Sequence, residues 1–366
     1  MDYRKAILDI FQKKTPELIP WQPRLYYWYG ARAGAESLPA RFSGRSLIEV
    51  YRELNVSPRY VPETVNIHML QLTPEKMRIK LFTEDDKTIT IYETPVGELT
   101  EVKTRVGLEE RISEFPCKRV EDLPAFEYVL RDVTYSFLHE EYVRADRLFG
   151  DLGVPQIYLL RRSPLQLLML NLMGIERTIF ALHDERAAVE RFMKVCEETE
   201  DGMYDAILSS PLKIVNFGEN LDSRLVSPEL FKTYLLPYYN ERIGRLHQAG
   251  KFCHIHIDGH LKGFLPFFRE LDFDGFEALT ASPQGDVEIE EIKEAIGDKV
   301  LLDGIPAIMF LPAFPRDELM RFTEKVVDLF SPNLILGVSD ELPPPAEIER
   351  IEEIRDYLTG RESHKK

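Results

Sequence analysis

Residues 251–264, KFCHIHIDGHLKGF, predict a buried β-strand that ends in polar side chains. Side chains alternate along a strand, so the odd positions of 253–257 share one face and the even positions share the other. The odd positions are cysteine and isoleucine. The even positions are His254 and His256, and Asp258 continues the same face. We expect the apolar face to pack against helices and the histidines and aspartate to point away from them.

The pattern of a short strand followed by a helix repeats from about residue 150 onward. Predicted strands lie at 156–160, 213–217, 252–257, 275–279, 300–302 and 334–338. Predicted helices lie at 187–208, 228–248, 261–270, 288–296, 316–330 and 346–358. Strands that alternate with helices pair in parallel through crossovers, so we predict an α/β fold, a (β/α)8 TIM barrel.

The first 150 residues are less regular. They contain a predicted strand at Leu25–Tyr29, a predicted hairpin at 77–92 and predicted helices near 46–54 and 121–130. We interpret them as an N-terminal extension, the first barrel units and a small β insertion, with the regular units in 151–360. The chain is then one domain, 1–366, because no linker or repeat divides it.

Composition excludes several classes of function. The net charge is −16, and apart from the final Lys365-Lys366 no Lys/Arg block occurs that could neutralise a phosphate backbone, so a nucleic-acid partner is not expected. Residues 1–14 are amphipathic and no apolar run is long enough to span a membrane, so we expect a cytoplasmic protein without a signal peptide. The three cysteines are scattered, which suits a reducing compartment.

Polar residues follow the ends of several predicted strands, where the chemistry of a barrel is placed. Carboxylate, imidazole, amide and hydroxyl groups occur there at Glu219, Asn220, His256, Asp258, Glu277, Thr280, Asp303, Asp340 and Glu341. His256 and Asp258 can chelate one divalent cation from a single strand end, and Glu219 and Asp340 could complete its shell. The sequence therefore predicts a site for Zn²⁺ or another divalent metal.

Each of these residues also has a structural interpretation. His256 and Asp258 could form a simple hydrogen-bonded pair, and His254 is expected to be buried and satisfied by hydrogen bonds. Glu219 is equally an ion-pair partner, and Glu341 is the alternative to Asp340. His260 is either the first residue of a helix or a rim group that touches the substrate.

Longer blocks of the sequence resemble the uroporphyrinogen decarboxylase superfamily. The block from Gly218 to Leu279 has a helix that begins at Ser-Pro-Glu, then a strand that ends in His-x-Asp-Gly. The likeness continues through 281–286, 297–306 and 336–346, and more weakly at PRLYYWYGARAGAESLP near the amino terminus. The resemblance implies a (β/α)8 barrel and one of two chemistries, decarboxylation without a cofactor or methyl transfer linked to cobalamin at a zinc ion.

The motifs depart from both chemistries. In the decarboxylase motif Arg32 matches the first carboxylate-binding arginine, whereas Glu36 falls on the second and would repel a carboxylate. In the methyltransferase motif Asp258 and Asp340 stand where zinc-binding cysteines are expected. Hard carboxylate ligands favour a more Lewis-acidic zinc, or manganese or magnesium, and an oxygen heteroatom over a thiol.

We therefore predict a metal-dependent methyltransferase that moves a methyl group between a small O- or S-methyl compound and a corrinoid. No cobalamin-binding motif is found, so a separate corrinoid protein would carry the corrinoid. The predicted catalytic residues are Asp303, Arg32 and His260. A homodimer is also compatible with the sequence.

One alternative is uroporphyrinogen decarboxylase or a related cofactor-free decarboxylase. Arg32, Arg41 or Arg45 would then hold substrate carboxylates, and Asp303 would stabilise a protonated pyrrole. The second alternative, from a different class, is a barrel that binds a metal or small molecule without turnover.

Overall fold

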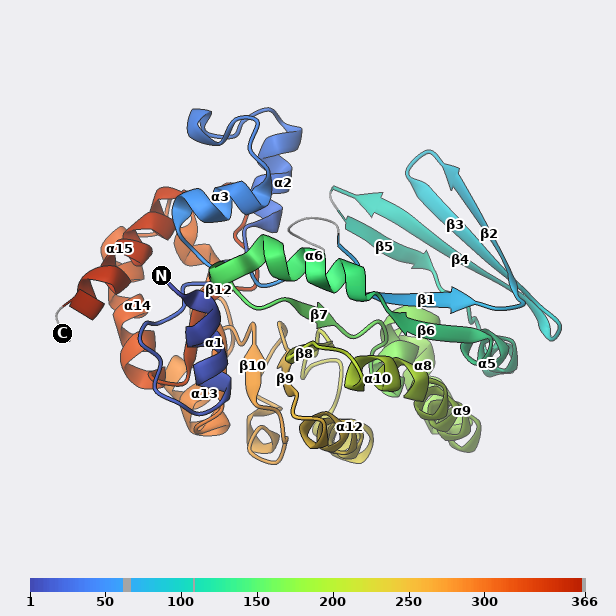
Figure 1. Cartoon of the computed structure of the whole chain (residues 1–366). Coiled ribbons are helices and arrows are strands. Elements are labelled where there is room, and N and C mark those ends of the chain that lie inside the picture. Colours follow the sequence, from blue (N-terminus) through green and yellow to red (C-terminus); the bar gives the residue numbers. More distant parts are fainter. Residues whose placement is uncertain (62–66, 108, 364–366) are drawn as a thin grey trace. The chain divides into compact units, whose positions relative to one another are not determined.

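The computed structural model describes residues 1–61, 67–107 and 109–363. By their contacts the residues form two compact units. The first unit contains residues 1–69, 139–158 and 212–366, and the second contains 70–138 and 159–211. Figure 1 labels most of the helices and strands of both. The description of the chain as one barrel domain stays a prediction.

Six parallel strands form the sheet of the first unit, in the order β12-β11-β10-β9-β8-β7. Their bounds are Gln156–Tyr158 (β7), Ile214–Gly218 (β8), Phe252–His256 (β9), Gly275–Glu277 (β10), Val300–Pro306 (β11) and Leu334–Ser339 (β12). The six predicted strands therefore all exist. The fold is α/β, as the alternation of strands and helices predicts.

Two short extended segments continue this sheet at its two edges. Trp21 forms a parallel bridge with Leu336 of β12, and Tyr60 forms one with Gln156 of β7. The two segments also meet, because the Ser57 N–H donates to the Trp21 carbonyl at 2.8 Å. These contacts lead from one edge of the sheet to the other, which is consistent with the predicted barrel.

The α-helices of the first unit lie before, between and after the strands of this sheet in the sequence. They are α1 (Tyr3–Phe11), α2 (Tyr26–Gly34), α3 (Leu47–Leu54), α6 (His139–Phe149), α11 (Pro228–Leu230), α12 (Leu236–Gln248), α13 (Ile289–Ile296), α14 (Arg316–Phe330) and α15 (Glu349–Ser363). A π-helical turn at Phe231–Leu235 joins α11 to α12, so helical structure covers the predicted 228–248. Among the described residues no helix combines the length and apolarity needed to cross a bilayer.

Helix α1 covers the amino ends of the strands. Its residues Ile7, Ile10 and Phe11 are buried in one cluster with apolar residues of the strands, among them Ile214 and Ile335. Full burial of such a side chain stabilises the fold by about 1.5–3 kcal/mol. This packing closes the end of the sheet opposite to the one where the polar residues gather.

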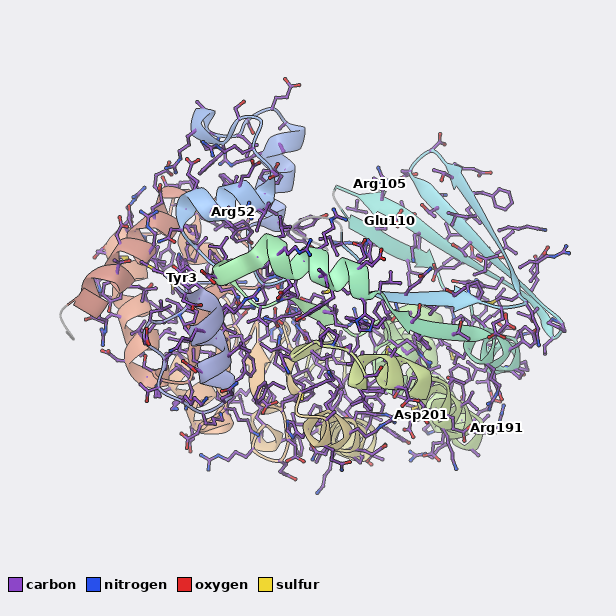
Figure 2. The ribbon with its side chains drawn as sticks, viewed as in Figure 1. Tyr3, Arg52, Arg105, Glu110, Arg191 and Asp201 are labelled. Carbon is purple, nitrogen blue, oxygen red and sulfur yellow. The ribbon has the colours of Figure 1, made fainter. Side chains whose placement is uncertain are left out.

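Two side chains connect α3 to the helices around it (Figure 2). The Tyr3 hydroxyl of α1 donates to the Asn55 carbonyl at the end of α3, at 2.8 Å. Arg52 of α3 donates from Nη2 to the Leu148 carbonyl of α6, at 2.6 Å. Both bonds satisfy carbonyls near helix ends, which have no partner within their own helix.

The second unit contains the β insertion and four longer helices. Its strands are β1 (Leu70–Pro74), β2 (Arg78–Glu84), β3 (Lys87–Thr94), β4 (Gly97–Val106), β5 (Glu109–Glu114) and β6 (Val133–Phe137). Strands β1 and β6 pair with each other, and the others form an antiparallel sheet in the order β2-β3-β4-β5. The predicted hairpin at 77–92 is thus the β2–β3 pair.

The α-helices of the second unit lie between β5 and β6 and after residue 158 in the sequence. They are α5 (Leu123–Arg131), α7 (Pro164–Leu167), α8 (Ile175–Asp184), α9 (Arg186–Thr199) and α10 (Asp201–Leu208), with a π-helical turn at Leu168–Leu172 after α7. Helix α5 packs on β3 and β4, where the rings of Tyr92 and Phe126 lie 6.0 Å apart. Arg191 of α9, labelled in Figure 2, pairs with Glu127 of α5 at 2.9 Å.

Three sequence predictions need correction. The strand predicted at Leu25–Tyr29 is wrong, because this run begins helix α2. Aromatic residues favour strands, but Trp28 is fully buried while Tyr26 is 39% exposed, as on the two sides of a helix. The predicted helix at 261–270 is reduced to a 3₁₀ turn at Leu265–Phe267, where Pro266 removes a backbone donor. The predicted helix at 187–208 is interrupted at Glu200.

All three cysteines are buried and have free thiols. Burial raises the pKa of Cys117 and of Cys196 to about 12, and raises that of Cys253 well above its usual value. A thiol that keeps its proton is a poor nucleophile and a poor metal ligand. Cys253 therefore belongs to the packed core, as its strand position predicts.

Candidate metal centre

Three side chains meet beyond the carboxyl ends of two strands of the first unit. His256 is the last residue of β9, Asp258 follows two residues later, and Asp340 follows the end of β12. Donor atoms of all three lie within 4.8 Å of one another. The neighbouring strands are parallel, so their carboxyl ends open on the same side of the sheet, which is why these residues converge.

The distances within this group suit a divalent cation. His256 Nε2 lies 3.8 Å from Asp258 Oδ2 and 3.7 Å from Asp340 Oδ1. These separations are too long for hydrogen bonds. Two donor atoms bound at about 2.1 Å to a tetrahedral ion lie about 3.4 Å apart, so small movements would bring all three onto one ion. One imidazole and two carboxylates are a donor set that zinc and other divalent metals accept.

The group is closed on one side and open on the other. The His256 side chain is only 4% exposed, whereas those of Asp258 and Asp340 are each 33% exposed. An ion held by these three groups would therefore face solvent at its remaining positions. Such an open position is what distinguishes a catalytic zinc site from a structural one.

Glu277, the last residue of β10, lies on the opposite side of the His256 ring. Its Oε1 is 3.7 Å from His256 Nδ1, while the donor group described above lies at Nε2. Burial alone would raise the pKa of Glu277, but Arg59 and the two histidines hold it well below its usual range. At this distance the carboxylate attracts a proton on the second ring nitrogen, which favours one orientation of a ligating histidine.

Glu277 is itself held by a buried network. Its carboxylate accepts hydrogen bonds from Arg59 Nη1 at 3.0 Å, from the Tyr60 hydroxyl and from the Asn216 amide. Burial and the Glu277 charge raise the pKa of Tyr60 well above its usual value, so the phenol keeps the proton that it donates. His254 Nδ1 lies 3.3 Å away from the same carboxylate.

Arg59 joins this carboxylate to a second one. Its Nη2 lies 2.7 Å from Asp303 Oδ1, and its Nε donates to Gln22 at 2.7 Å. Burial raises the pKa of Asp303 to about 6, with Glu277 adding to the rise and Arg59 opposing it. Asp303 is fully buried and has a φ of 86°, a backbone conformation that costs a non-glycine residue about 1–3 kcal/mol. Such strain is concentrated at functional sites.

Arg24 connects the network to the metal-binding group. Its guanidinium hydrogen-bonds to Asp340 and lies 2.8 Å from Glu341 and 3.5 Å from Glu277. Its side chain is 7% exposed, so these charges interact in a poorly solvated environment. Arg24 thereby fixes the position of Asp340 relative to the strand ends.

The charges around His256 favour a cation. The guanidiniums of Arg24 and Arg59 are outnumbered by five carboxylates, those of Asp258, Asp340, Glu277, Glu341 and Asp303. Burial disfavours a charged His256, but Asp258, Glu277 and Asp340 raise its pKa to about 10. The ring therefore attracts either a proton or a metal ion in the place of that proton.

The structure places the other predicted site residues as follows. Glu219 is buried directly after β8 and is not one of the three residues whose donor atoms gather. His260 Nδ1 lies 3.2 Å from Asp222 Oδ2, with 39% of its side chain exposed. Arg32 donates to the Ala346 carbonyl at 3.4 Å and its guanidinium lies over the Trp28 ring. Metal ligation by Glu219 and the catalytic roles of Asp303, Arg32 and His260 stay predictions.

Two of the open alternatives are narrowed by the geometry. Asp340 belongs to the group around His256, whereas Glu341 is 6% exposed and pairs with Arg24 at 2.8 Å. His254 is fully buried, its Nε2 lies 2.8 Å from Gln156 Oε1, and burial lowers its pKa. His254 therefore has the structural environment expected for it.

A second group of potential ligands lies at the opposite end of the sheet. It consists of His247, Cys253 and Asp274. Asp274 Oδ2 already accepts the Cys253 N–H at 2.8 Å and lies 3.0 Å from His247 Nε2. Polar contacts at this end of a barrel serve stability, so we do not regard the group as a metal site.

Sequence reasoning missed Arg24, Arg59, Tyr60 and Asn216. Asn216 lies inside a predicted strand, and its polar side chain in the run KIVNFG was the available indication. Arg59 and Tyr60 occur side by side in SPRYVPE, between two prolines that favour extended backbone. Arg24 directly precedes the run that was predicted as a strand and is a helix.

Similar proteins agree with this fold. A methyltransferase from Methanosarcina mazei has a TM-score of 0.63 at 12% identity, covering 99% of each chain. A B12-independent methionine synthase from Shewanella sp. W3-18-1, solved with selenomethionine, gives 0.46 at 12% identity, covering 95% of this chain and 98% of that one. The likeness to the Methanosarcina mazei protein shows the fold. No curated protein matches the sequence. Residues 162–359 match the family Uroporphyrinogen decarboxylase (URO-D), so the chain belongs to this family.

Proposed function

We propose that the chain is a metal-dependent methyltransferase with its active site at the mouth of a (β/α)8 barrel. The observation that carries the proposal is the convergence of His256, Asp258 and Asp340 at the strand ends. These three residues would hold Zn²⁺ or another divalent ion. When bound, the ion would act as a Lewis acid on the heteroatom that carries or accepts the methyl group.

The surrounding residues would prepare this site. Glu277 orients the His256 ring, and Arg24 holds Asp340 in place. Because Arg59 anchors Glu277 at 3.0 Å, the orientation of His256 depends on a rigid buried network and not on a mobile loop. Preorganisation of this kind reduces the reorganisation needed as charge develops in the reaction.

The ligand set bears on the substrate. Two carboxylates in place of thiolates suit hard partners, so we propose an alcohol, phenol or ether oxygen as the methyl-bearing or methyl-accepting atom. The Methanosarcina mazei protein of similar fold is a methyltransferase, which supports the same reaction class. A separate corrinoid protein would act as the partner in methyl transfer.

The decarboxylase alternative depends on arginines near the amino terminus. Arg41 forms a bidentate ion pair with Glu352 at 2.8 and 2.7 Å, and Arg45 pairs with Glu53 at 3.0 Å. Each of these arginines would exchange a carboxylate of the protein for that of a substrate, which costs little because both ion pairs are partly exposed.

The test is methyl transfer from a panel of methyl ethers to cob(I)alamin by the zinc-loaded protein. We expect transfer by the wild type, its loss in Asp340→Ala, and its retention in the control Asp274→Asn, which alters the opposite end of the sheet. Decarboxylation of a porphyrinogen by metal-free protein would refute the proposal in favour of a decarboxylase. Tight metal binding without transfer from any ether would favour the non-catalytic barrel.

X-ray absorption of the zinc-loaded protein tests the ligand set separately. We expect only nitrogen and oxygen neighbours at about 2.0–2.2 Å. A sulfur neighbour at about 2.3 Å would show that the metal is elsewhere in the chain.

A further inference from the structure

Among the described residues, strand β2, Arg78–Glu84, forms an open edge of the insertion sheet (Figure 1). It pairs with β3 on one side, and every one of its residues is exposed. Three of the exposed residues are large and apolar: Ile79 is 42% exposed, Leu81 66% and Phe82 47%. A long exposed edge strand with apolar side chains is a template for pairing with another strand.

The hairpin register shows which backbone groups point outward. Glu84 and Lys87 flank the two-residue turn Asp85-Asp86, and the pair next to such a turn is hydrogen-bonded. Hydrogen-bonded and non-hydrogen-bonded pairs then alternate along the strand. Even-numbered residues of β2 therefore bond to β3, whereas the N–H and C=O groups of Ile79, Leu81 and Thr83 face away from the sheet.

We propose that β2 pairs antiparallel with β2 of a second copy of this chain, with the two-fold axis at Leu81. In this register Ile79 faces Thr83 of the second copy, and Leu81 faces its own counterpart. All the outward N–H and C=O groups of Ile79, Leu81 and Thr83 in both strands are then hydrogen-bonded. If one strand were shifted by two residues along the other, one of these residues in each strand would lie beyond the end of its partner strand. The two insertion sheets become one continuous sheet.

The side chains fit the same register. It places Arg78 opposite Glu84 of the second copy on one face, and the symmetry repeats this pair at the other end. Within the described residues neither Arg78 nor Glu84 has an ion pair: Glu93, which faces Arg78 across the hairpin, is bound by Lys80. Opposite charges directly across two strands stabilise the pairing.

The same face brings Lys80 beside Phe82 of the second copy, where the aliphatic part of the lysine side chain can pack against the ring. On the other face the exposed Leu81 side chains meet at the axis. Charge complementarity, apolar contact and backbone hydrogen bonding thus select one register. A strand that complements itself in this way identifies the partner as a second copy of the chain.

Sedimentation velocity of the full chain tests this interface. We expect the wild type to show a concentration-dependent dimer, and Leu81→Lys to shift it to monomer by placing two ammonium groups together at the axis. Val96→Lys is the matched control, since Val96 is 59% exposed in the β3–β4 turn of the same sheet, and it should leave the dimer unchanged. A wild type that stays monomeric at its highest soluble concentration overturns the proposal.

Charge exchange gives the sharper test. Arg78→Glu and Glu84→Arg each place like charges together twice, so each variant alone should dimerise about tenfold or more weakly than the wild type. The double variant restores both opposite-charge pairs and should dimerise again. An equal mixture of the two single variants should form a heterodimer, because every charge then faces its opposite. Single variants that dimerise normally, or a mixture that stays monomeric, contradict this register whatever the enzyme's activity.

Discussion

Replacing Glu277 with glutamine should weaken metal binding although Glu277 is not one of the three grouped ligands. The substitution keeps the shape of the side chain but removes the charge that faces His256 Nδ1 at 3.7 Å. The amide oxygen can keep the hydrogen bond from the Tyr60 hydroxyl, but the amide NH2 then faces Arg59 Nη1 and cannot accept its hydrogen bond, while Arg59 keeps its contact with Asp303 at 2.7 Å. For metal binding, the loss is in the orientation and basicity of the imidazole.

The loss of metal affinity in Glu277→Gln can be worked out in two ways. A metal ion on Nε2 would lie about 8 Å from the Glu277 carboxylate, where charges of +2 and −1 attract by about 4 kcal/mol at an effective dielectric constant of about 20. This is an upper limit, because Arg59 and Arg24 offset the carboxylate. Carboxylates that orient a ligating histidine typically contribute about 10–100-fold in affinity, or about 1.4–2.7 kcal/mol. We expect a loss of about 2 kcal/mol in Glu277→Gln.

Calorimetric titration of metal-free protein with Zn²⁺ measures this loss as a rise in Kd. Circular dichroism should first show that the variant is folded. Asp274→Asn is the control, since it removes a carboxylate at the other end of the sheet and should leave the Kd unchanged. A folded Glu277→Gln variant with the wild-type Kd would refute the role given to this carboxylate.

Two further predictions concern stability. Arg59→Met leaves Glu277 and Asp303 buried without their shared partner, and should lower the free energy of unfolding by about 3–5 kcal/mol in urea titrations; a loss below about 1 kcal/mol would contradict the network. Asp222→Asn should lower the free energy of unfolding by about 2 kcal/mol at pH 7. Burial raises the pKa of Asp222, but hydrogen bonds from Arg224 and His260 outweigh burial and lower the pKa to about 2. A carboxyl group with a lowered pKa stabilises the fold above its unfolded value of 3.8, and this stabilisation is lost as the pH falls toward 2. Urea titrations should therefore show the free energies of unfolding of the wild type and Asp222→Asn converging in acid. A difference between them that is constant with pH would count against this linkage.

Much of the fold and part of the site follow from local patterns. Alternation along 252–258 places His256 and Asp258 at a strand end, and the parallel arrangement of the strands brings Asp340 to the same place. These inferences need only the period of a strand and the topology of parallel sheets, both of which are visible in the sequence.

The buried network could not be predicted in the same way. Arg59 and Tyr60 reach the site through an isolated bridge to Gln156, and Arg24 through the bridge of Trp21 to Leu336. Such short segments lack the alternation that marks a strand, and their partners are distant in sequence. The aromatic run after Arg24 also suggested a strand, although it begins a helix in which Trp28 is buried and Tyr26 is exposed.

Metal content of the purified protein tests the central claim most directly. After loading with Zn²⁺ and removal of excess metal, the wild type should retain about one ion per chain, since the gathered donors form one site. His256→Ala should retain none while keeping its circular dichroism spectrum, and His247→Ala, from the group at the other end of the sheet, should retain the ion. Metal that survives His256→Ala, or a wild type that holds no metal, would contradict the account.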